Sequence, residues 1–249
     1  MFINIKARRS IMFHVARVSD LLNQGFSKQQ LAFQIALINQ LTWVDLTLQK
    51  YIWTEDIMME QFNYCPELIY VVLDMETLDV AASTTMLCTT LERAMSCSSW
   101  EDISGYRTLS THDPDGDTIF GIDLTVAPQY QTLGLASKLI STAFLASVIG
   151  GHKRGALLGA RVPAYQKHAP RRSIEQHVFG MKAGQKTCDP EIKLYMSEGF
   201  RPLRIIPNYM DDEESLNYGV LMMLDNPFLD TLSPEQSATI QALAEAFMS

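Results

Sequence analysis

The sequence has few basic residues and no long apolar run. Across 249 residues, 20 Lys and Arg stand against 28 Asp and Glu, which gives a net charge of −8 at pH 7. This balance disfavours nucleic acid as a partner, because phosphate binding needs a basic face. No apolar run approaches the roughly 20 residues of a membrane span, and His14 and Arg17 interrupt the N-terminal apolar stretch, which makes it a poor signal peptide. We therefore expect a cytoplasmic protein with no membrane contact.

Several catalytic and metal-binding patterns are also missing. The four cysteines form no CxxC pair, so we expect reduced structural thiols at Cys65, Cys88, Cys97 and Cys188. The five histidines show no HExxH spacing, which argues against zinc. Neither the G-x-S-x-G elbow of serine hydrolases nor the phosphate loop of nucleotide hydrolases occurs. These absences predict a protein without a metal ion.

An aspartate-rich loop at 113–117 partly matches the pattern of a calcium-binding loop. Asp113, Asp115 and Asp117 alternate as in a calcium loop, but the glycine has the wrong offset and no glutamate occupies the twelfth position. The neighbouring His112 is a candidate general base, although a loop histidine without a catalytic role is the simpler interpretation.

Apolar residues make up 47% of the chain, which suits one large or two small globular domains. Their periodicity predicts an N-terminal helical segment over 19–52, with Ser27 capping a helix that carries Leu31, Ile35, Ile38 and Leu41 on one face. A polar, irregular stretch follows at 89–117. Strands are predicted at 68–73, 79–87, 119–126, 156–162, 203–206 and 218–224, the first two as a hairpin, and further helices at 133–149, 189–199 and 233–248. A strand–helix–strand unit together with hairpins predicts a mixed sheet.

The most informative segment joins strand 119–126 to the helix after it. Gln131, Gly134 and Ala136 have the spacing Q-x-x-G-x-A, and the helix opens directly from them. Such a loop aims several backbone N–H groups at one point, where the helix dipole adds partial positive charge. Small residues let a phosphate approach the backbone. The segment predicts a pyrophosphate site, although a turn glycine without a ligand is the alternative.

A second punctuated element lies about 60 residues later. Asp189 and Pro190 suit the N-cap and first position of a helix, and Gly199 follows its end. Phe200 is then expected to fold back against Leu194 or Tyr195.

Together these segments resemble the GNAT acyltransferase superfamily. The Q-x-x-G-x-A loop is similar to its acyl-coenzyme A signature, and DPEIKLYMSEGF is similar to its last helix, with the family's Leu-Tyr-x-x-x-Gly-Phe pattern. The segments HDPDGDTIFGIDLTVAPQY and NYMDDEESLNYGVLMMLDNP resemble a subgroup often found beside a carbon–nitrogen hydrolase domain. The resemblance implies an α/β GNAT fold over 1–249, with a core at about 55–228 and a mixed, mostly antiparallel sheet of about seven strands flanked by helices.

The resemblance also implies where an acyl-coenzyme A would bind. The pantetheine arm would pair with the backbone of Leu124, Thr125 and Val126. Lys138 would add charge or stay solvated. The pyrophosphate would lie over the loop and the helix start, at Gln131, Thr132, Leu133, Gly134, Leu135, Ala136 and Ser137.

Two side chains are implied as catalytic. Acyl transfer to an amine is helped by a base for the amine and an acid for the leaving thiolate. Asp123 lies where many superfamily members carry a carboxylate, and an aspartate that faces solvent or another strand is the alternative. Tyr195 matches the family's tyrosine acid, and a tyrosine packed on Phe200 is the alternative, although both roles can hold at once.

The sequence thus predicts an N-acyltransferase that uses acetyl-CoA and an amine acceptor by direct attack in a ternary complex. The alternative is a non-catalytic acyl-CoA-binding module, acting as a sensor or as the partner of a hydrolase. The last strands or the terminal helices could form the interface of a homodimer. The acidic run 211–214 would be a solvated loop or would steer a cationic amine. Four residues are expected on loops around the acceptor pocket: Arg161, Tyr165, Tyr209 and Ser215.

Overall fold

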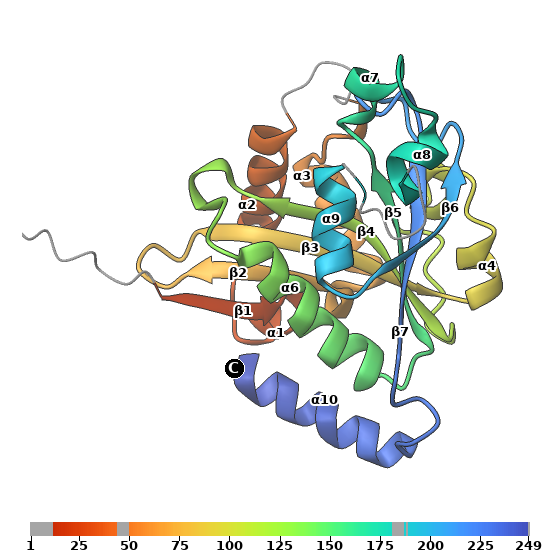
Figure 1. Cartoon of the computed structure of the whole chain (residues 1–249). Coiled ribbons are helices and arrows are strands. Elements are labelled where there is room, and N and C mark those ends of the chain that lie inside the picture. The colour runs from red at the N-terminus through yellow and green to blue at the C-terminus, as the bar shows by residue number, and fades with distance from the viewer. Residues whose placement is uncertain (1–11, 44–49, 181–186, 188, 249) are drawn as a thin grey trace, which may run out of the picture.

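One twisted seven-stranded sheet forms the centre of the molecule (Figure 1). The computed structural model describes residues 12–43, 50–180, 187 and 189–248. The strand order is β1-β2-β3-β4-β5-β7-β6; β4 and β5 pair in parallel, and the other neighbouring strands pair antiparallel. The strands are β1 (Phe13–Arg17), β2 (Ile69–Asp74), β3 (Val80–Thr89), β4 (Thr118–Val126), β5 (Gly155–Arg161), β6 (Arg201–Ile206) and β7 (Gly219–Asp225). This confirms the predicted mixed α/β sheet of about seven strands.

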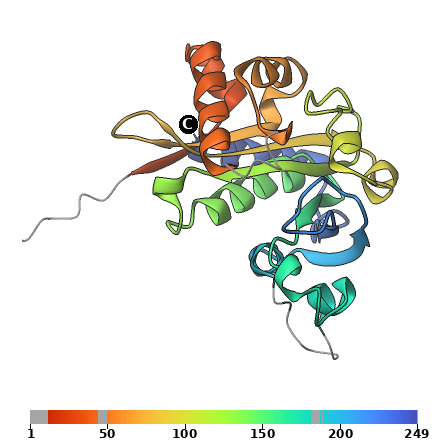
Figure 2. The same cartoon turned by 90° about the horizontal axis from the view of Figure 1, so that it is seen from above.

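Helices cover both faces of this sheet. Figure 2 shows α2 and α3 on one face and α6 on the other. The helices before the long strand β4 are α1 (Val18–Asn23), α2 (Lys28–Thr42), α3 (Glu55–Tyr64), η2 (Pro66–Leu68), α4 (Leu91–Met95) and α5 (Trp100–Ile103). Those after it are η3 (Pro128–Tyr130), α6 (Leu135–Ala143), η4 (Phe144–Ile149), α7 (Tyr165–His168), α8 (Ile174–Phe179), α9 (Pro190–Ser197) and α10 (Pro234–Met248).

The structure differs from the sequence predictions in the N-terminal half. The edge strand β1 was not predicted, because five residues that include His14 and Arg17 give too weak an apolar pattern. The stretch 89–117 is not wholly irregular, since Thr90 and Ser99 cap the short helices α4 and α5. Of the four apolar residues predicted on one face of α2, Leu31, Ile35 and Ile38 are buried and Leu41 is 48% exposed.

The predicted helix 133–149 is regular for only nine residues. It is α-helical through α6 and continues as the π-helix η4 from Phe144 to Ile149. The Gly150 N–H donates to the Leu145 carbonyl at 2.9 Å, an i to i+5 bond. A π-helix is rare and is often found at functional sites.

The well-punctuated helix is confirmed as α9. The Asp189 carboxylate accepts from the backbone N–H groups of Glu191 and Ile192, and Gly199 has a φ of +95°. The Phe200 ring packs edge-on against the Tyr195 ring at 5.8 Å. The local capping signals therefore fixed the orientation of the side chains that α9 carries.

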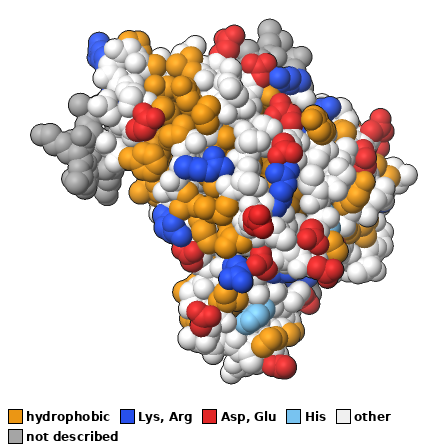
Figure 3. Space-filling view, turned by 90° about the vertical axis from the view of Figure 1, so that its right-hand side faces the viewer, with side chains coloured by type: hydrophobic (Ala, Val, Ile, Leu, Met, Phe, Trp, Pro, Cys, Tyr) orange, Lys and Arg blue, Asp and Glu red, His pale blue; other side chains and the backbone are white. Residues whose placement is uncertain are grey.

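The C-terminal helix α10 packs against η4 and β1. Ser233 caps it, as predicted, by accepting from the Gln236 N–H at 3.3 Å. Arg17, which is 7% exposed, ties β1 to it through an ion pair with Glu245 at 2.7 Å. On the face shown in Figure 3, acidic and basic side chains are interspersed rather than gathered into one basic surface.

A glycine in β7 is expected to be essential for packing. A Cβ on Gly219 would lie 2.5 Å from the ring of Tyr209, which is 1% exposed. Gly219→Ala should lower the free energy of unfolding by about 2 kcal/mol, because the core cannot expand to take the methyl group. The measurement is the urea midpoint at unchanged m-value. The control is Gly121→Ala, whose Cβ would meet Leu158 at an ordinary 3.4 Å; equal midpoints for the two variants would contradict the argument.

Candidate active site

The site lies where β4 and β5 stop pairing. Their parallel pairing runs from Ile119 opposite Ala156 to Gly121 opposite Leu158 and ends there. The register of β3 against β4 shifts at the same level, which leaves Ile122 as a bulge residue. Its carbonyl accepts from the Trp100 indole N–H at 3.0 Å. A pocket that is partly open to solvent extends from this opening; together with the adjoining solvent, its empty space is about 1070 Å³.

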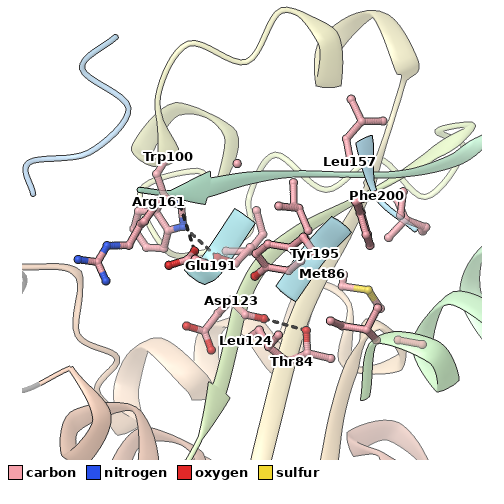
Figure 4. Close-up of a pocket in the computed structure, with 18 of the residues that line it drawn as sticks. Thr84, Met86, Trp100, Asp123, Leu124, Leu157, Arg161, Glu191, Tyr195 and Phe200 are labelled. Atoms are coloured by element: carbon pink, nitrogen blue, oxygen red, sulfur yellow. Dashed lines mark hydrogen bonds between the residues drawn. The ribbon is translucent and has the colours of Figure 1, made fainter. Parts of the chain in front are cut away.

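Asp123 lines this pocket from β4 (Figure 4). Its Oδ2 accepts from the Thr125 hydroxyl at 2.9 Å, and its Oδ1 accepts from the Asn39 amide at 3.3 Å. Both of these partners are neutral, so the Thr125 hydrogen bond, which lowers the pKa, offsets only part of the desolvation of the carboxylate. Burial accordingly raises the pKa of Asp123 to about 7. A carboxyl with this pKa can hold or release a proton near neutral pH.

Asn39 positions Asp123 and was not singled out in the sequence. It is 2% exposed on the apolar face of α2, and its Oδ1 accepts from the Trp53 N–H at 2.9 Å. Trp43, which follows α2, donates its indole N–H to the Thr125 hydroxyl at 3.2 Å. The sequence did carry a signal for Asn39, because it is a polar residue among the buried positions of an amphipathic helix.

Tyr195 faces the same pocket from α9 (Figure 4). Burial raises its pKa well above the usual value, and the nearby charges of Glu191 and Asp123 raise it further. The phenol therefore keeps its proton at neutral pH. The ring also packs on Phe200, as the alternative interpretation of this tyrosine expects, and its role as the acid stays a prediction.

Glu191 is a second carboxyl in the pocket that the sequence interpretation missed. It precedes Tyr195 by four residues, so both lie on one face of α9. Its Oε1 accepts from the backbone N–H of Arg161 at 3.1 Å. Burial raises its pKa to about 7, although the charge of Arg161 acts in the opposite direction. The i, i+4 spacing from the tyrosine was the signal that could have found it.

Arg161 joins the pocket to the acidic run. Its side chain is 11% exposed and pairs with Asp212 at 2.7 Å and with Glu214 at 3.2 Å. The guanidinium also lies over the Trp43 ring at 5.1 Å. Asp212 is fully buried. The acidic run is therefore not only a solvated loop, because its residue Asp212 is a buried ion-pair partner of Arg161.

The other residues expected around the acceptor divide into two groups. Tyr209 lines the pocket, packed against Gly159 and Gly219. Ser215 instead accepts from the Val162 N–H at 3.0 Å and donates to Asp212. Tyr165 does not line the pocket and packs against Tyr218.

The remaining candidates lie away from this site. His112 borders a different pocket, and its Nδ1 accepts from the Cys88 N–H at 3.1 Å. Asp117 pairs with Arg154 at 2.5 Å. Cys188 lies outside the described residues, whereas Cys65, Cys88 and Cys97 are buried free thiols. Among the described residues, no group of three or more His, Cys, Asp or Glu could hold a metal ion, and no helix is long and apolar enough to cross a membrane.

The loop after β4 is exposed from Gln131 to Gly134. Gly134 has a φ of +77° and Thr132 a φ of +69°, and a Cβ on Gly134 would meet no atom within 4 Å. No side chain caps the N-terminus of α6, so its first N–H groups have no side-chain acceptor from the cap position. Leu133 is 50% exposed, whereas Leu135 is buried.

Polar side chains around this loop are already engaged. The Gln131 amide donates to the Val126 carbonyl at 3.3 Å, and the Ser137 hydroxyl donates to Glu198 at 2.5 Å. Lys138 donates to the Phe13 carbonyl at 2.9 Å, which holds its charge beside β1. Ala136 is half-buried.

The last residues of β4 connect the loop to the pocket. Leu124, Thr125 and Val126 pair with β3 on one side, opposite Thr84, Ser83 and Ala82. Leu124 lines the pocket, and Thr125 is buried towards α2. Their other side faces the gap that opens as β5 diverges.

Comparison with known proteins supports one family. No protein-family model matches the chain. It is 32% identical over 180 residues to the uncharacterized N-acetyltransferase YkwB of Bacillus subtilis, covering 72% of this chain and 78% of that protein. It is also 30% identical over 129 residues to the probable hydrolase YhcX of the same organism, covering 51% of this chain but only 25% of that longer protein.

Two solved structures share the fold. One is the GphF GNAT-like decarboxylase in complex with isobutyryl-CoA, with a TM-score of 0.66, 19% identity, and coverage of 86% of this chain and 98% of that one. The other is the loading GNATL domain of CurA from Lyngbya majuscula, with a TM-score of 0.68, 12% identity and the same coverage.

The chain belongs to the GNAT acetyltransferase superfamily. Within it, the N-acetyltransferase relative favours an enzyme over a non-catalytic binding module. The YhcX match is consistent with the resemblance to the subgroup found beside a hydrolase domain.

Proposed function

We propose that this protein transfers an acyl group from an acyl-CoA to a primary amine by direct attack in a ternary complex. The observation that carries the proposal is the convergence of Tyr195 with Asp123 and Glu191 in one pocket, at the end of the strand that leads to the Gly134 loop. Two carboxyls with pKa values of about 7 and one protonated phenol supply a base and an acid together.

The proposed roles follow the chemistry of the step. Asp123 takes a proton from the amine as its nitrogen forms a bond with the thioester carbonyl carbon. Tyr195 donates its proton to the sulfur as the carbon–sulfur bond breaks. The buried carboxyls also favour a cationic amine before it loses its proton.

The proposed coenzyme site uses the backbone. The N–H groups from Thr132 to Ser137 would hold the pyrophosphate, because no side chain caps this helix N-terminus. Leu124, Thr125 and Val126 would pair with the pantetheine arm along the side of β4 that β5 leaves. The family resemblance by itself points to acetyl-CoA as the acyl donor, and the amine could be a small molecule, an amino acid, a peptide terminus or a lysine side chain.

Tyr195→Phe tests the acid. The variant keeps the ring packed on Phe200 and loses only the hydroxyl, so kcat should fall about 100-fold while the Kd of acetyl-CoA stays within twofold. The measurement is steady-state turnover with a panel of amines, alongside calorimetric binding. Tyr218→Phe, outside the pocket, should leave both values unchanged. An unaltered kcat in Tyr195→Phe would remove this tyrosine from the mechanism.

A further inference from the structure

The pocket continues past the reacting groups into an apolar chamber between the sheet and the α6–η4 helix. We define the chamber by Gly121, Ala156 and Leu158 on the sheet side and by Ala143, Phe144 and Val148 on the helix side. The Asp123 carboxyl lies on the other side of the bulge at Ile122, and Glu191 lies beside the end of β5, where it accepts from the Arg161 N–H.

Small residues create this space. A Cβ on Gly121 would lie 3.4 Å from the Leu158 Cβ and 3.7 Å from the Leu157 carbonyl oxygen, both ordinary contacts, so neither backbone conformation nor packing requires glycine there. Ala143 and Ala156 are 3% and 8% exposed and face the same chamber. Larger side chains at these positions would fill the space, as is normal between a helix and a sheet.

The helix wall is also unusual at this point. The π-helix η4 begins at Phe144, directly after Ala143, and it carries both Phe144 and Val148 into the chamber wall. Val148 follows Ala143 by five positions, which corresponds to a wall about 7 Å long. An acetyl group would occupy only part of that length.

The order of features along β4 assigns a role to the chamber. The coenzyme loop follows the end of β4, and Leu124 to Val126 lie between that loop and Asp123. Gly121 lies on the other side of Asp123, away from the loop. On the α2 face, Trp43 and Trp53 line the pocket, and we assign that side to the amine.

We propose that the acyl group transferred is a medium-length apolar chain, longer than acetyl, which this chamber holds. The inference rests on the proposed function, because it needs the thioester beside Tyr195 and Asp123. The apolar wall also excludes acyl groups that end in a carboxylate, since a buried unpaired charge is costly.

The first test is calorimetric binding of acetyl-, butyryl- and hexanoyl-CoA to the intact chain. Each buried methylene strengthens binding by about fourfold, so the Kd of hexanoyl-CoA should be at least tenfold below that of acetyl-CoA. Equal values, or tighter binding of acetyl-CoA, would overturn the chamber assignment while leaving the proposed function intact. If none of the three binds, both proposals fail.

A substitution that fills the chamber tests whether the acyl chain binds there. Ala143→Leu should weaken hexanoyl-CoA binding at least tenfold and leave acetyl-CoA binding within twofold, because the added side chain occupies the chamber. Ser141→Leu, which puts the same side chain on the exposed face of α6, should change neither. Equal losses for both ligands, or no loss for hexanoyl-CoA, would contradict the proposal. Should Ala143→Leu not fold, the chain-length comparison on the unaltered protein still decides.

Discussion

Replacing Gly134 by tryptophan is expected to raise the Kd of acetyl-CoA at least 100-fold while the fold remains intact. The space next to Gly134 is open, with no atom within 4 Å of a built Cβ, and the free N–H groups at the start of α6 face the same region. An indole there would occupy the space that the phosphates need. The measurement is calorimetric titration, with circular dichroism to show that the variant is folded.

The matched control is Gly25→Trp. Gly25 has a φ of +93°, is exposed and also has no atom within 4 Å of a built Cβ. Both variants therefore carry the same kind of backbone strain, on the order of 1 kcal/mol, but only one lies at the loop after β4. If Gly134→Trp binds acetyl-CoA as well as Gly25→Trp does, the loop is not the pyrophosphate site.

Asp123→Asn is expected to lower kcat/KM by about 10²- to 10⁴-fold, the range for loss of a general base. The pH profile gives the sharper readout. Because burial raises the pKa of Asp123 to about 7, the unaltered enzyme should gain activity as pH rises through 7. The variant cannot ionise at this position and should lose that rise.

The same variant should be more stable than the unaltered chain at high pH. A folded-state pKa near 7 lies above the ordinary value of 3.8, so the folded protein holds this proton more tightly than the unfolded chain. The stabilisation is fully present below pH 3.8 and is lost as pH rises through 7. Asp123→Asn avoids this loss, and we expect it to gain about 2 kcal/mol at pH 8.5 and nothing at pH 4.

Glu191→Gln is the control that separates the two carboxyls. It removes the other group with a pKa of about 7 and leaves Asp123 with its partners Asn39 and Thr125. We expect a smaller loss of kcat/KM, with the rise through pH 7 retained. If Glu191→Gln abolishes activity and Asp123→Asn does not, the base is Glu191.

Local signals in the sequence were enough to predict most of the fold. The caps Ser27, Asp189 and Ser233 act within a few residues of themselves, so their helices could be predicted without tertiary information. The strand hairpin and the parallel pair followed from apolar runs and their connections. Local signals did not predict strand β1, because its stability comes from pairing with β2, more than 50 residues away.

Local sequence signals predicted less of the site than of the fold. Asp123 and Tyr195 were predicted by family resemblance, but Asn39 contacts Asp123 across 84 residues of sequence. The pairing of Glu191 with the Arg161 N–H, 30 residues away, likewise depends on how α9 docks on β5. The apolar chamber needs three small residues from β4, β5 and α6 to face one another, a coincidence that periodicity does not reveal.

Calorimetric titration of the intact chain with acetyl-CoA and its dephospho- and desulfo-analogues tests the central claim most directly. We predict micromolar binding of acetyl-CoA that weakens when phosphates are removed, because the loop from Gln131 to Ser137 would hold them. The absence of binding at millimolar ligand would contradict the assignment of an acyl-CoA site to this pocket.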